Sequence, residues 1–156
     1  MTQPFNFREA FAKPLKAAGF KKKRPTTWYR DGAETICVVN LQKSPYGNEF
    51  YVNIGLWLKA LGDNDKPVEY HCHIRTRWEE LIPEDEFKIK RLLDLEDMSM
   101  FDEDRVKEIP RLLQSYIFPF FAKVDTLKKI RAMYGTPTWP VGLVLIEARD
   151  FILNKK

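Results

Sequence analysis

The spacing of hydrophobic residues at the start of the chain predicts a helix over about residues 7–18. Apolar side chains recur at helical intervals at Phe7, Phe11, Leu15 and Ala18. Asn6 and Glu9 have the spacing of a capping box, and Gly19 suits the left-handed position that follows a helix. Pro14 removes one internal hydrogen bond, which predicts a kink or a later start to the helix.

From Thr27 the hydrophobic period changes to two, and β-branched and aromatic residues dominate. Asp31-Gly32 supplies a tight hairpin turn between the first two expected strands. The expected strands cover residues 28–30, 34–42, 50–58 and 70–78. Because the connecting turns are short, consecutive strands should pair antiparallel, which predicts a meander of about four strands.

After Pro83 the apolar positions return to helical spacing. The pattern predicts a short helix over residues 84–95 and a long one over 104–134, kinked at Pro119 and ended by Gly135. The tail, residues 141–153, fits a strand or a helix, and its length favours a helix. The predicted fold is α+β, one domain over residues 1–156: an antiparallel meander sheet packed against an N-terminal helix and a C-terminal helical half.

Alternation along the strands separates the two faces of the sheet. One face is apolar and is expected to be buried in the core beneath helices from both ends of the chain. Its members are Cys37, Val39, Leu41, Phe50, Val52, Ile54, Leu56, Leu58, Cys72 and Ile74.

The opposite face carries amides, aromatic rings and cations, a mixture that is typical of binding surfaces. Its candidate ligand-binding residues are Asn40, Gln42, Tyr51, Asn53, Trp57, His73, Arg75 and Arg77, with His71 beside them. An antiparallel sheet often keeps one face simply solvated, and that interpretation stays open. Asparagine and glutamine favour the binding interpretation, because neither is typical of a solvated strand.

His71 and His73 occupy alternate strand positions, as in many metal sites, and Glu69 extends the row. No third ligand stands at a diagnostic spacing, so we expect no metal and no cofactor, and histidines that face solvent or form hydrogen bonds. Cys72 is expected on the face away from both histidines, which argues against a cysteine nucleophile. No nucleophile elbow or glycine-rich phosphate loop is present, and catalytic residues stay unassigned.

The charge of the 156-residue chain is a small difference between large numbers, 26 basic and 22 acidic residues, for a net charge of +4. Four adjacent cations, Lys21 to Arg24, predict a solvated turn or, as an alternative, a phosphate-backbone contact. Charged residues interrupt the first segment, and no apolar run approaches the roughly 20 residues of a spanning helix. With two cysteines, the expected location is the cytoplasm, without a membrane.

Several of these segments form a pattern in a fixed order. They are Gly19-Phe20-Lys21-Lys22-Lys23, Thr27-Trp28-Tyr29, Val39-Asn40-Leu41-Gln42-Lys43-Ser44, Tyr46-Gly47, Phe50-Tyr51-Val52-Asn53-Ile54-Gly55 and Cys72-His73-Ile74-Arg75. The pattern resembles the bacterial family called domain of unknown function 4304, over about residues 5–81. The resemblance implies an α+β cytoplasmic protein of bacterial type. It carries no catalytic residues, because the family is functionally uncharacterised.

Three functions compete on this sequence. The first is a non-enzymatic binding module, whose polar sheet face captures a protein partner, possibly of the immunity type, or a small polar ligand. The second is an enzyme that holds an anionic substrate with Arg75 and Arg77 and transfers protons through His71 or His73. The third is nucleic-acid binding through Lys21 to Arg24. We expect the first, because amides and guanidinium groups hold ligands but do not ordinarily transfer protons.

Overall fold

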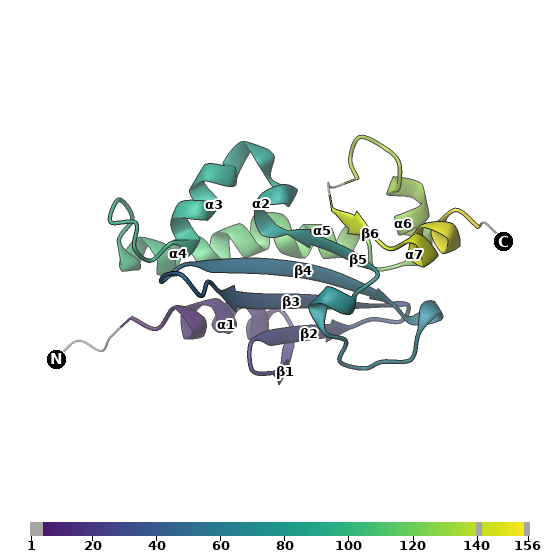
Figure 1. The fold of residues 1–156 in the computed structure, drawn as a ribbon, viewed down its shortest axis with the longest axis horizontal. Coiled ribbons are helices and arrows are strands. Elements are labelled where there is room, and N and C mark those ends of the chain that lie inside the picture. The colour runs from purple at the N-terminus through teal and green to yellow at the C-terminus, as the bar shows by residue number, and fades with distance from the viewer. Residues whose placement is uncertain (1–4, 140–141, 155–156) are drawn as a thin grey trace.

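The computed structural model describes residues 5–139 and 142–154 of the chain and has the expected α+β class. A six-stranded sheet has the order β1-β2-β3-β4-β5-β6, and every neighbouring pair is antiparallel. The strands are β1 (Lys21–Arg24), β2 (Thr27–Asp31), β3 (Thr35–Lys43), β4 (Phe50–Leu58), β5 (Ile74–Arg77) and β6 (Leu143–Val144). The predicted meander is thus confirmed, with one strand added at each edge (Figure 1).

The first helix, α1 (Phe7–Ala17), begins and ends as its sequence predicts. The Asn6 side chain accepts a hydrogen bond from the Glu9 backbone N–H at 3.1 Å, and Gly19 adopts φ +90°. Pro14 lies inside the helix without ending it.

The second half of the chain is helical but more divided than the sequence predicts. Its elements are α2 (Trp78–Leu81), the 3₁₀ turn η3 (Pro83–Asp85), α3 (Glu86–Leu93), α4 (Asp102–Leu112), the π-helical turn η4 (Leu113–Ile117), α5 (Phe118–Lys123), α6 (Leu127–Met133) and α7 (Ile146–Ile152). The expected helix over residues 104–134 breaks before α6, because the Thr126 side chain caps the Lys129 N–H and starts a new helix. Residues 140 and 141, part of the expected tail, lie outside the described residues.

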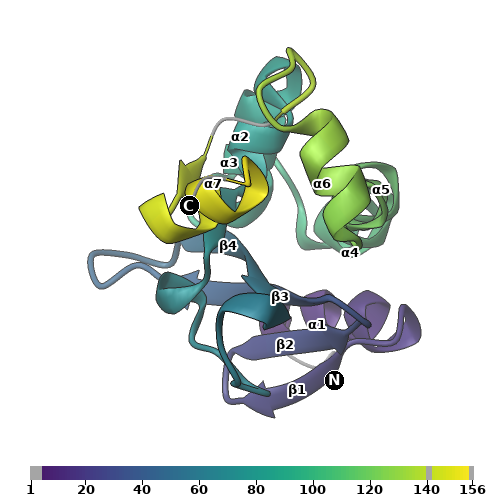
Figure 2. The same cartoon turned by 90° about the vertical axis from the view of Figure 1, so that its right-hand side faces the viewer.

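Helices cover the apolar face of the sheet as predicted. α1, α4 and α5 lie on the same side of the strands (Figure 2). The buried cluster there includes Val39, Leu41, Val52 and Ile54 from the sheet and extends from α1 to α7. That continuity suits one folding unit, although the single-domain organisation stays a prediction. None of the helices among the described residues is long and apolar enough to cross a membrane.

Two segments near the site have a secondary structure that differs from the predicted one. Lys21 to Arg24 is a strand, not a turn, because the short turn at Pro25 and Thr26 returns the chain to pair Lys22 with Trp28. Lysine is tolerated there because an edge strand is half open to water. The fourth expected strand, 70–78, shrinks to β5, since residues 69–71 form the 3₁₀ turn η2 (Glu69–His71).

Candidate functional site

Three amide side chains form a connected network on the polar face of the sheet. Asn40 lies directly opposite Asn53 in the register of β3 and β4, and Gln42 is two residues further along the same face. The Asn53 Nδ2 group donates to Asn40 Oδ1 and to Gln42 Oε1, both at 3.0 Å. Asn40 in turn donates to Thr27 Oγ1 at 2.9 Å. The prediction that these amides share one face and one patch is confirmed.

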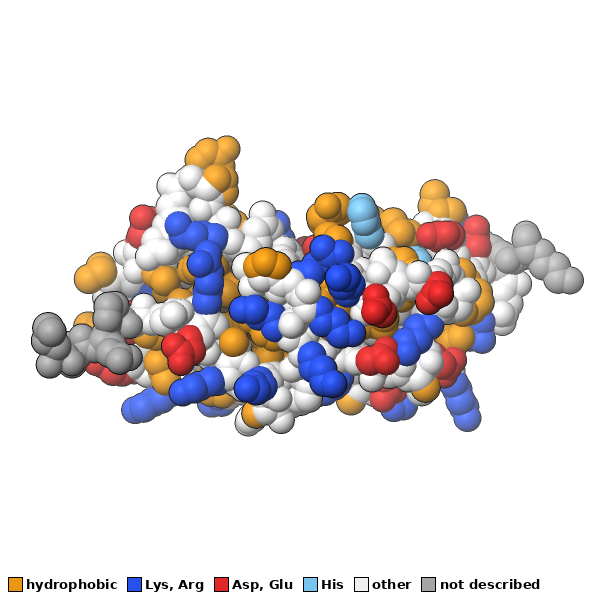
Figure 3. Space-filling model, turned by 90° about the horizontal axis from the view of Figure 1, so that it is seen from below, with side chains coloured by type: hydrophobic (Ala, Val, Ile, Leu, Met, Phe, Trp, Pro, Cys, Tyr) orange, Lys and Arg blue, Asp and Glu red, His pale blue; other side chains and the backbone are white. Residues whose placement is uncertain are grey.

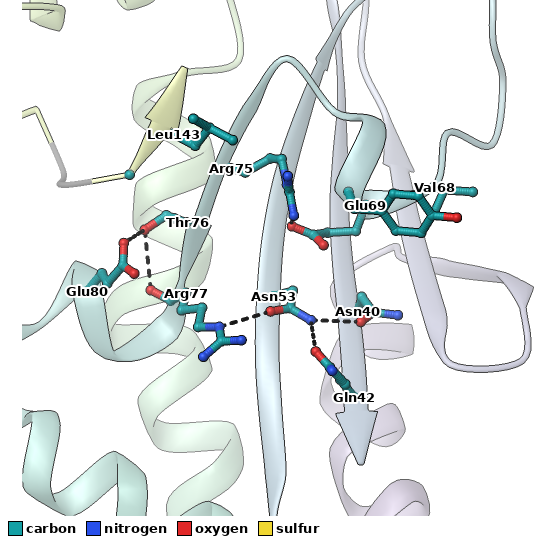
Figure 4. Close-up of a pocket in the computed structure, with 12 residues that line it drawn as sticks. Asn40, Gln42, Asn53, Val68, Glu69, Arg75, Thr76, Arg77, Glu80 and Leu143 are labelled. Atoms are coloured by element: carbon teal, nitrogen blue, oxygen red, sulfur yellow. Dashed lines mark hydrogen bonds and ion pairs between the residues drawn. The ribbon is translucent and has the colours of Figure 1, made fainter. Parts of the chain in front are cut away.

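Arg77 joins this network from β5. It pairs with Asn53 in the register of β4 and β5, and its Nε donates to Asn53 Oδ1 at 3.3 Å (Figure 4). Its guanidinium carbon lies 4.8 Å from the centre of the Tyr51 ring, within cation–π range. The amide and the aromatic ring therefore hold this cation in place.

Arg75 lies two residues before Arg77 in β5, on the same face of the sheet. It forms an ion pair with Glu69 of η2. Arg75 Nε donates to Glu69 Oε1 at 3.3 Å, and the Glu69 side chain is only 9% exposed. Burial raises the pKa of the Glu69 carboxyl above its usual value, and the neighbouring Arg75 opposes that rise. Glu69 is thus a buried carboxyl whose raised pKa is opposed mainly by Arg75 and also by Arg77.

These side chains surround a pocket of about 820 Å³. Its lining residues are Asn40, Gln42, Asn53, Val68, Glu69, Tyr70, Arg75, Thr76, Arg77, Glu80, Gly142 and Leu143. Thr76 Oγ1 donates to Glu80 Oε2 at 3.1 Å on the wall next to Arg77 (Figure 4). Tyr70 and Leu143 are exposed apolar side chains on the same lining. The pocket combines a polar, hydrogen-bonded floor with apolar groups that a ligand can cover.

Three predicted site residues do not line this pocket: Tyr51, which contacts Arg77 beside it, and Trp57 and His73, whose contacts lie elsewhere. The Trp57 Nε1 group donates to the Gly62 carbonyl at 3.0 Å, and the Trp57 and His73 rings are 4.2 Å apart between centroids. His73 is buried, and its Nδ1 accepts a hydrogen bond from the Leu58 N–H at 2.9 Å. Trp57 keeps its place on the polar face of β4, but the segment between β4 and β5 covers that end of the face. β5 begins only at Ile74, so strand alternation does not extend back to His71 and His73.

The pairing of His71 with His73 fails for the same reason. His71 is exposed in η2, whereas His73 is buried beside β4. Neither histidine lines the pocket. The enzymatic alternative therefore loses the two proton-transfer groups that it assigned to this face.

His73 should make stability depend on pH. Burial lowers its pKa from the ordinary 6.5, and Glu147 only partly opposes this effect. Since the unfolded chain then binds more protons, His73 favours folding fully above about pH 6.5, and this contribution is lost as the pH falls towards the lowered pKa. Urea unfolding at pH 7 and pH 5 should show a larger loss for the natural protein than for His73→Gln. His71→Gln, at an exposed position, is the matched control and should keep the natural slope.

Cys72 also departs from its expected place. It is buried, but against Gly55, Tyr29 and Val38 on the polar side of the sheet and not in the main core. A Cβ on Gly55 would lie 2.8 Å from the Cys72 sulfur, so only glycine allows this approach. The segment that joins β4 to β5 crosses this face and delivers the cysteine, and Tyr29 Oη donates to the Pro67 carbonyl at 2.8 Å within the same layer.

Both thiols should be inert in the folded protein. Cys37 and Cys72 are buried, and burial raises the pKa of each to about 12. A thiol-specific reagent at pH 8 should label neither cysteine in the native state and both in denaturant. Rapid labelling of one thiol without denaturant would show that its cover opens readily.

Seven pocket residues were absent from the sequence-based site: Val68, Glu69, Tyr70, Thr76, Glu80, Gly142 and Leu143. Glu69 was considered only as an extension of the histidine row, and no spacing rule links it to Arg75. Glu80 follows β5 in α2, and Leu143 comes from β6, far along the chain. Only the tertiary arrangement brings them to one wall.

Comparison with known protein families extends the resemblance seen in the sequence. The family model described as Domain of unknown function (DUF4304) matches residues 11–123, from α1 to the end of α5. The match therefore continues beyond the sheet into helices for which the sequence offered no motif. No curated protein and no solved structure matches the chain. Because the matched segment covers well over half of the 156 residues and most of the pocket lining, the chain belongs to the DUF4304 family.

Proposed function

We propose that the pocket on the polar sheet face binds a small ligand that carries a carboxylate or phosphate group, and that the protein binds this ligand without transforming it. The observation that carries the proposal is the state of Arg75 and Arg77. Each uses its Nε for an internal contact, and the terminal nitrogens of both guanidinium groups have no hydrogen-bond partner in the described part of the chain. Guanidinium groups with free terminal N–H groups suit the paired oxygens of a carboxylate or phosphate group.

The floor of the pocket supports this proposal through its internal hydrogen bonds. Asn53 is held by both Asn40 and Arg77, so its side chain is oriented before binding. A ligand then loses less free energy in ordering the site. The volume of about 820 Å³ falls in the range of small-molecule sites, which favours a small ligand over a protein segment.

The chemistry of the lining supports binding over catalysis. Amide and guanidinium groups dominate the floor, and the two histidines are elsewhere. Tyr70 and Leu143 offer apolar contact at the rim. A ligand with an anionic end and an apolar or aromatic body matches both parts.

The test compares two double variants with the natural protein. Arg77→Ala with Gln42→Ala removes one cation and one amide at exposed pocket positions, while Lys107→Ala with Gln114→Ala removes the same chemistry from exposed helical positions. Native mass spectrometry of protein purified from its own host should show a retained small molecule. Thermal shift with a panel of carboxylates and phosphates should then show stabilisation of the natural protein.

We expect the pocket variant to lose both signals while its far-ultraviolet circular dichroism is unchanged, and the helical variant to keep both. Equal ligand retention by the two variants would move the site away from this pocket. Arg75 is left intact in this experiment, because its removal would strand the buried Glu69 carboxyl without its ion-pair partner.

One observation favours an enzymatic function as the second candidate. Glu69 lines the pocket, is buried and has a raised pKa, which are properties of a general acid or base. Turnover of an anionic substrate that is abolished in Glu69→Gln but kept in His71→Ala would replace the binding proposal with this one.

Two broader features belong to the same proposal: action in the bacterial cytoplasm and, as an alternative occupant, a protein partner of the immunity type. A pull-down from the host with the natural protein and the pocket variant separates these occupants. A protein lost only from the variant would favour the partner, and a small molecule lost only from the variant would favour the ligand.

A further inference from the structure

The basic strand β1 lies at an open edge of the sheet. Its strand pairing is with β2, and no other strand among the described residues pairs with it. Seen from below, the surface formed by this end of the sheet and α1 carries many lysine and arginine side chains and few acidic ones near its middle (Figure 3). Lys23 and Arg24 donate to the carbonyls of Asp65 and Lys66 and so hold the β4–β5 segment. Within the described residues, Lys21 and Lys22 make no such contact.

A groove of about 430 Å³ runs between α1 and β1. Its lining residues are Glu9, Ala12, Lys13, Lys16, Phe20, Lys21, Lys22 and Trp28. The floor is apolar, and four lysines surround it: Lys13 and Lys16 from α1, Lys21 and Lys22 from β1. All four are exposed and have no hydrogen-bond or ion-pair partner in residues 5–139 and 142–154. Glu9 is the single acidic residue of the lining.

We infer that this edge and groove bind an extended acidic segment of a partner protein, which adds to the sheet as a strand beside β1. An edge strand offers backbone N–H and C=O groups to a peptide, and an adjacent pocket selects alternate side chains. Here the pocket is apolar and its rim is basic. The fitting peptide therefore alternates apolar side chains, which enter the groove, with carboxylates on the other face of the added strand, where Lys21 lies opposite Tyr29. Lys13, Lys16 and Lys22 add attraction to the acidic peptide from the groove side.

Other occupants fit these residues less well. A second copy of the chain paired edge to edge would place the Lys21–Arg24 strand against itself, and like charges directly opposite one another destabilise a strand pair. Single-stranded nucleic acid binds through bases that stack on exposed aromatic rings. Phe20 and Trp28 are only 2% and 4% exposed, so they offer no ring face for stacking. Lysines also protect edges from aggregation, but protection alone requires no apolar groove beside the strand.

The first experiment measures binding of fluorescein-labelled heptapeptides by anisotropy. One peptide alternates glutamate with valine, and a second has the same composition with its glutamates grouped at one end. We expect the alternating peptide to bind about tenfold more tightly, because only it can place carboxylates and apolar groups on opposite sides of a strand. Equal binding of the two peptides would overturn strand addition and leave charge attraction alone.

A matched pair of variants then locates the site. Lys21→Glu with Lys22→Glu should weaken binding of the alternating peptide by about tenfold or more. Lys107→Glu with Lys128→Glu makes the same change of charge at exposed helical positions and should leave affinity within about twofold. Both variants are checked for a natural circular dichroism spectrum. Equal weakening in the two would show a general charge effect and overturn the assignment.

Amide hydrogen exchange distinguishes strand addition from attraction between side chains, because side-chain attraction alone would leave the exchange rates of the backbone amides unchanged. Addition of the alternating peptide should slow amide exchange in residues 21–24, since new backbone hydrogen bonds form at the open edge. Unchanged exchange there would overturn strand addition. Tighter binding of a short oligothymidylate than of the peptide, lost in Lys21→Glu with Lys22→Glu, would assign the surface to nucleic acid instead.

Discussion

Replacement of Arg105 by alanine is expected to lower the free energy of unfolding by about 3–5 kcal/mol. Arg105 projects from α4 and is only 2% exposed. Its guanidinium group donates to the backbone carbonyls of Arg91, Leu92, Asp94, Asp97 and Met100, at 2.7 to 3.2 Å, and forms an ion pair with Asp102. One side chain thus organises the loop between α3 and α4, and its loss leaves several carbonyls without a donor.

Two further variants separate this role from charge alone. Arg105→Lys should recover only part of the lost stability. A lysine has one ammonium group, which cannot reach all the carbonyls that the three nitrogens of the planar guanidinium group contact. Arg111→Ala removes an exposed arginine of the same helix and should cost less than about 1 kcal/mol. Urea unfolding measures all three. A cost below about 1 kcal/mol for Arg105→Ala would show that water replaces the guanidinium group and that the loop does not depend on it.

Replacement of Leu41 by alanine is expected to cost about 2–5 kcal/mol, the range for a large residue truncated in a packed core. Leu41 is 1% exposed on β3, where it packs in the main cluster beneath the helices. Its cross-strand partner is Val52 on β4, another member of that cluster. The change leaves a cavity that the sheet on one side and the helices on the other cannot close.

Lys43→Ala provides the control in the same strand. Lys43 lies two residues from Leu41 and has the same parity, but it is exposed and should change stability by less than about 0.5 kcal/mol. Thermal and urea unfolding compare the two variants. Similar costs for both would mean that burial does not distinguish these positions and that the assignment of the apolar face is wrong.

The faces of the central strands follow directly from the sequence, because strand alternation is a local property of the backbone. Asn40, Gln42 and Asn53 were predicted on one face from parity alone, and the structure joins them by hydrogen bonds. The cap at Asn6 and the left-handed Gly19 are local in the same sense. Parity misplaced Cys72 and did not predict the burial of His73, because the chain there leaves the strand, and nothing in the residue types marks that point.

Only the tertiary structure decided which part of the polar face stays open. The segment between β4 and β5 folds over Ile36 and Val38 and turns that end of the face into a small second core, held by Tyr29 and Pro67. The same crossing brings Glu69 to Arg75, and β6 brings Leu143 to the opposite wall. Burial of Arg105 has the same origin, since its carbonyl partners lie in a different element. Such contacts join residues that are far apart in the sequence and that no helical or strand periodicity relates. The local sequence pattern therefore determined the sheet and its two faces, whereas long-range packing determined the pocket.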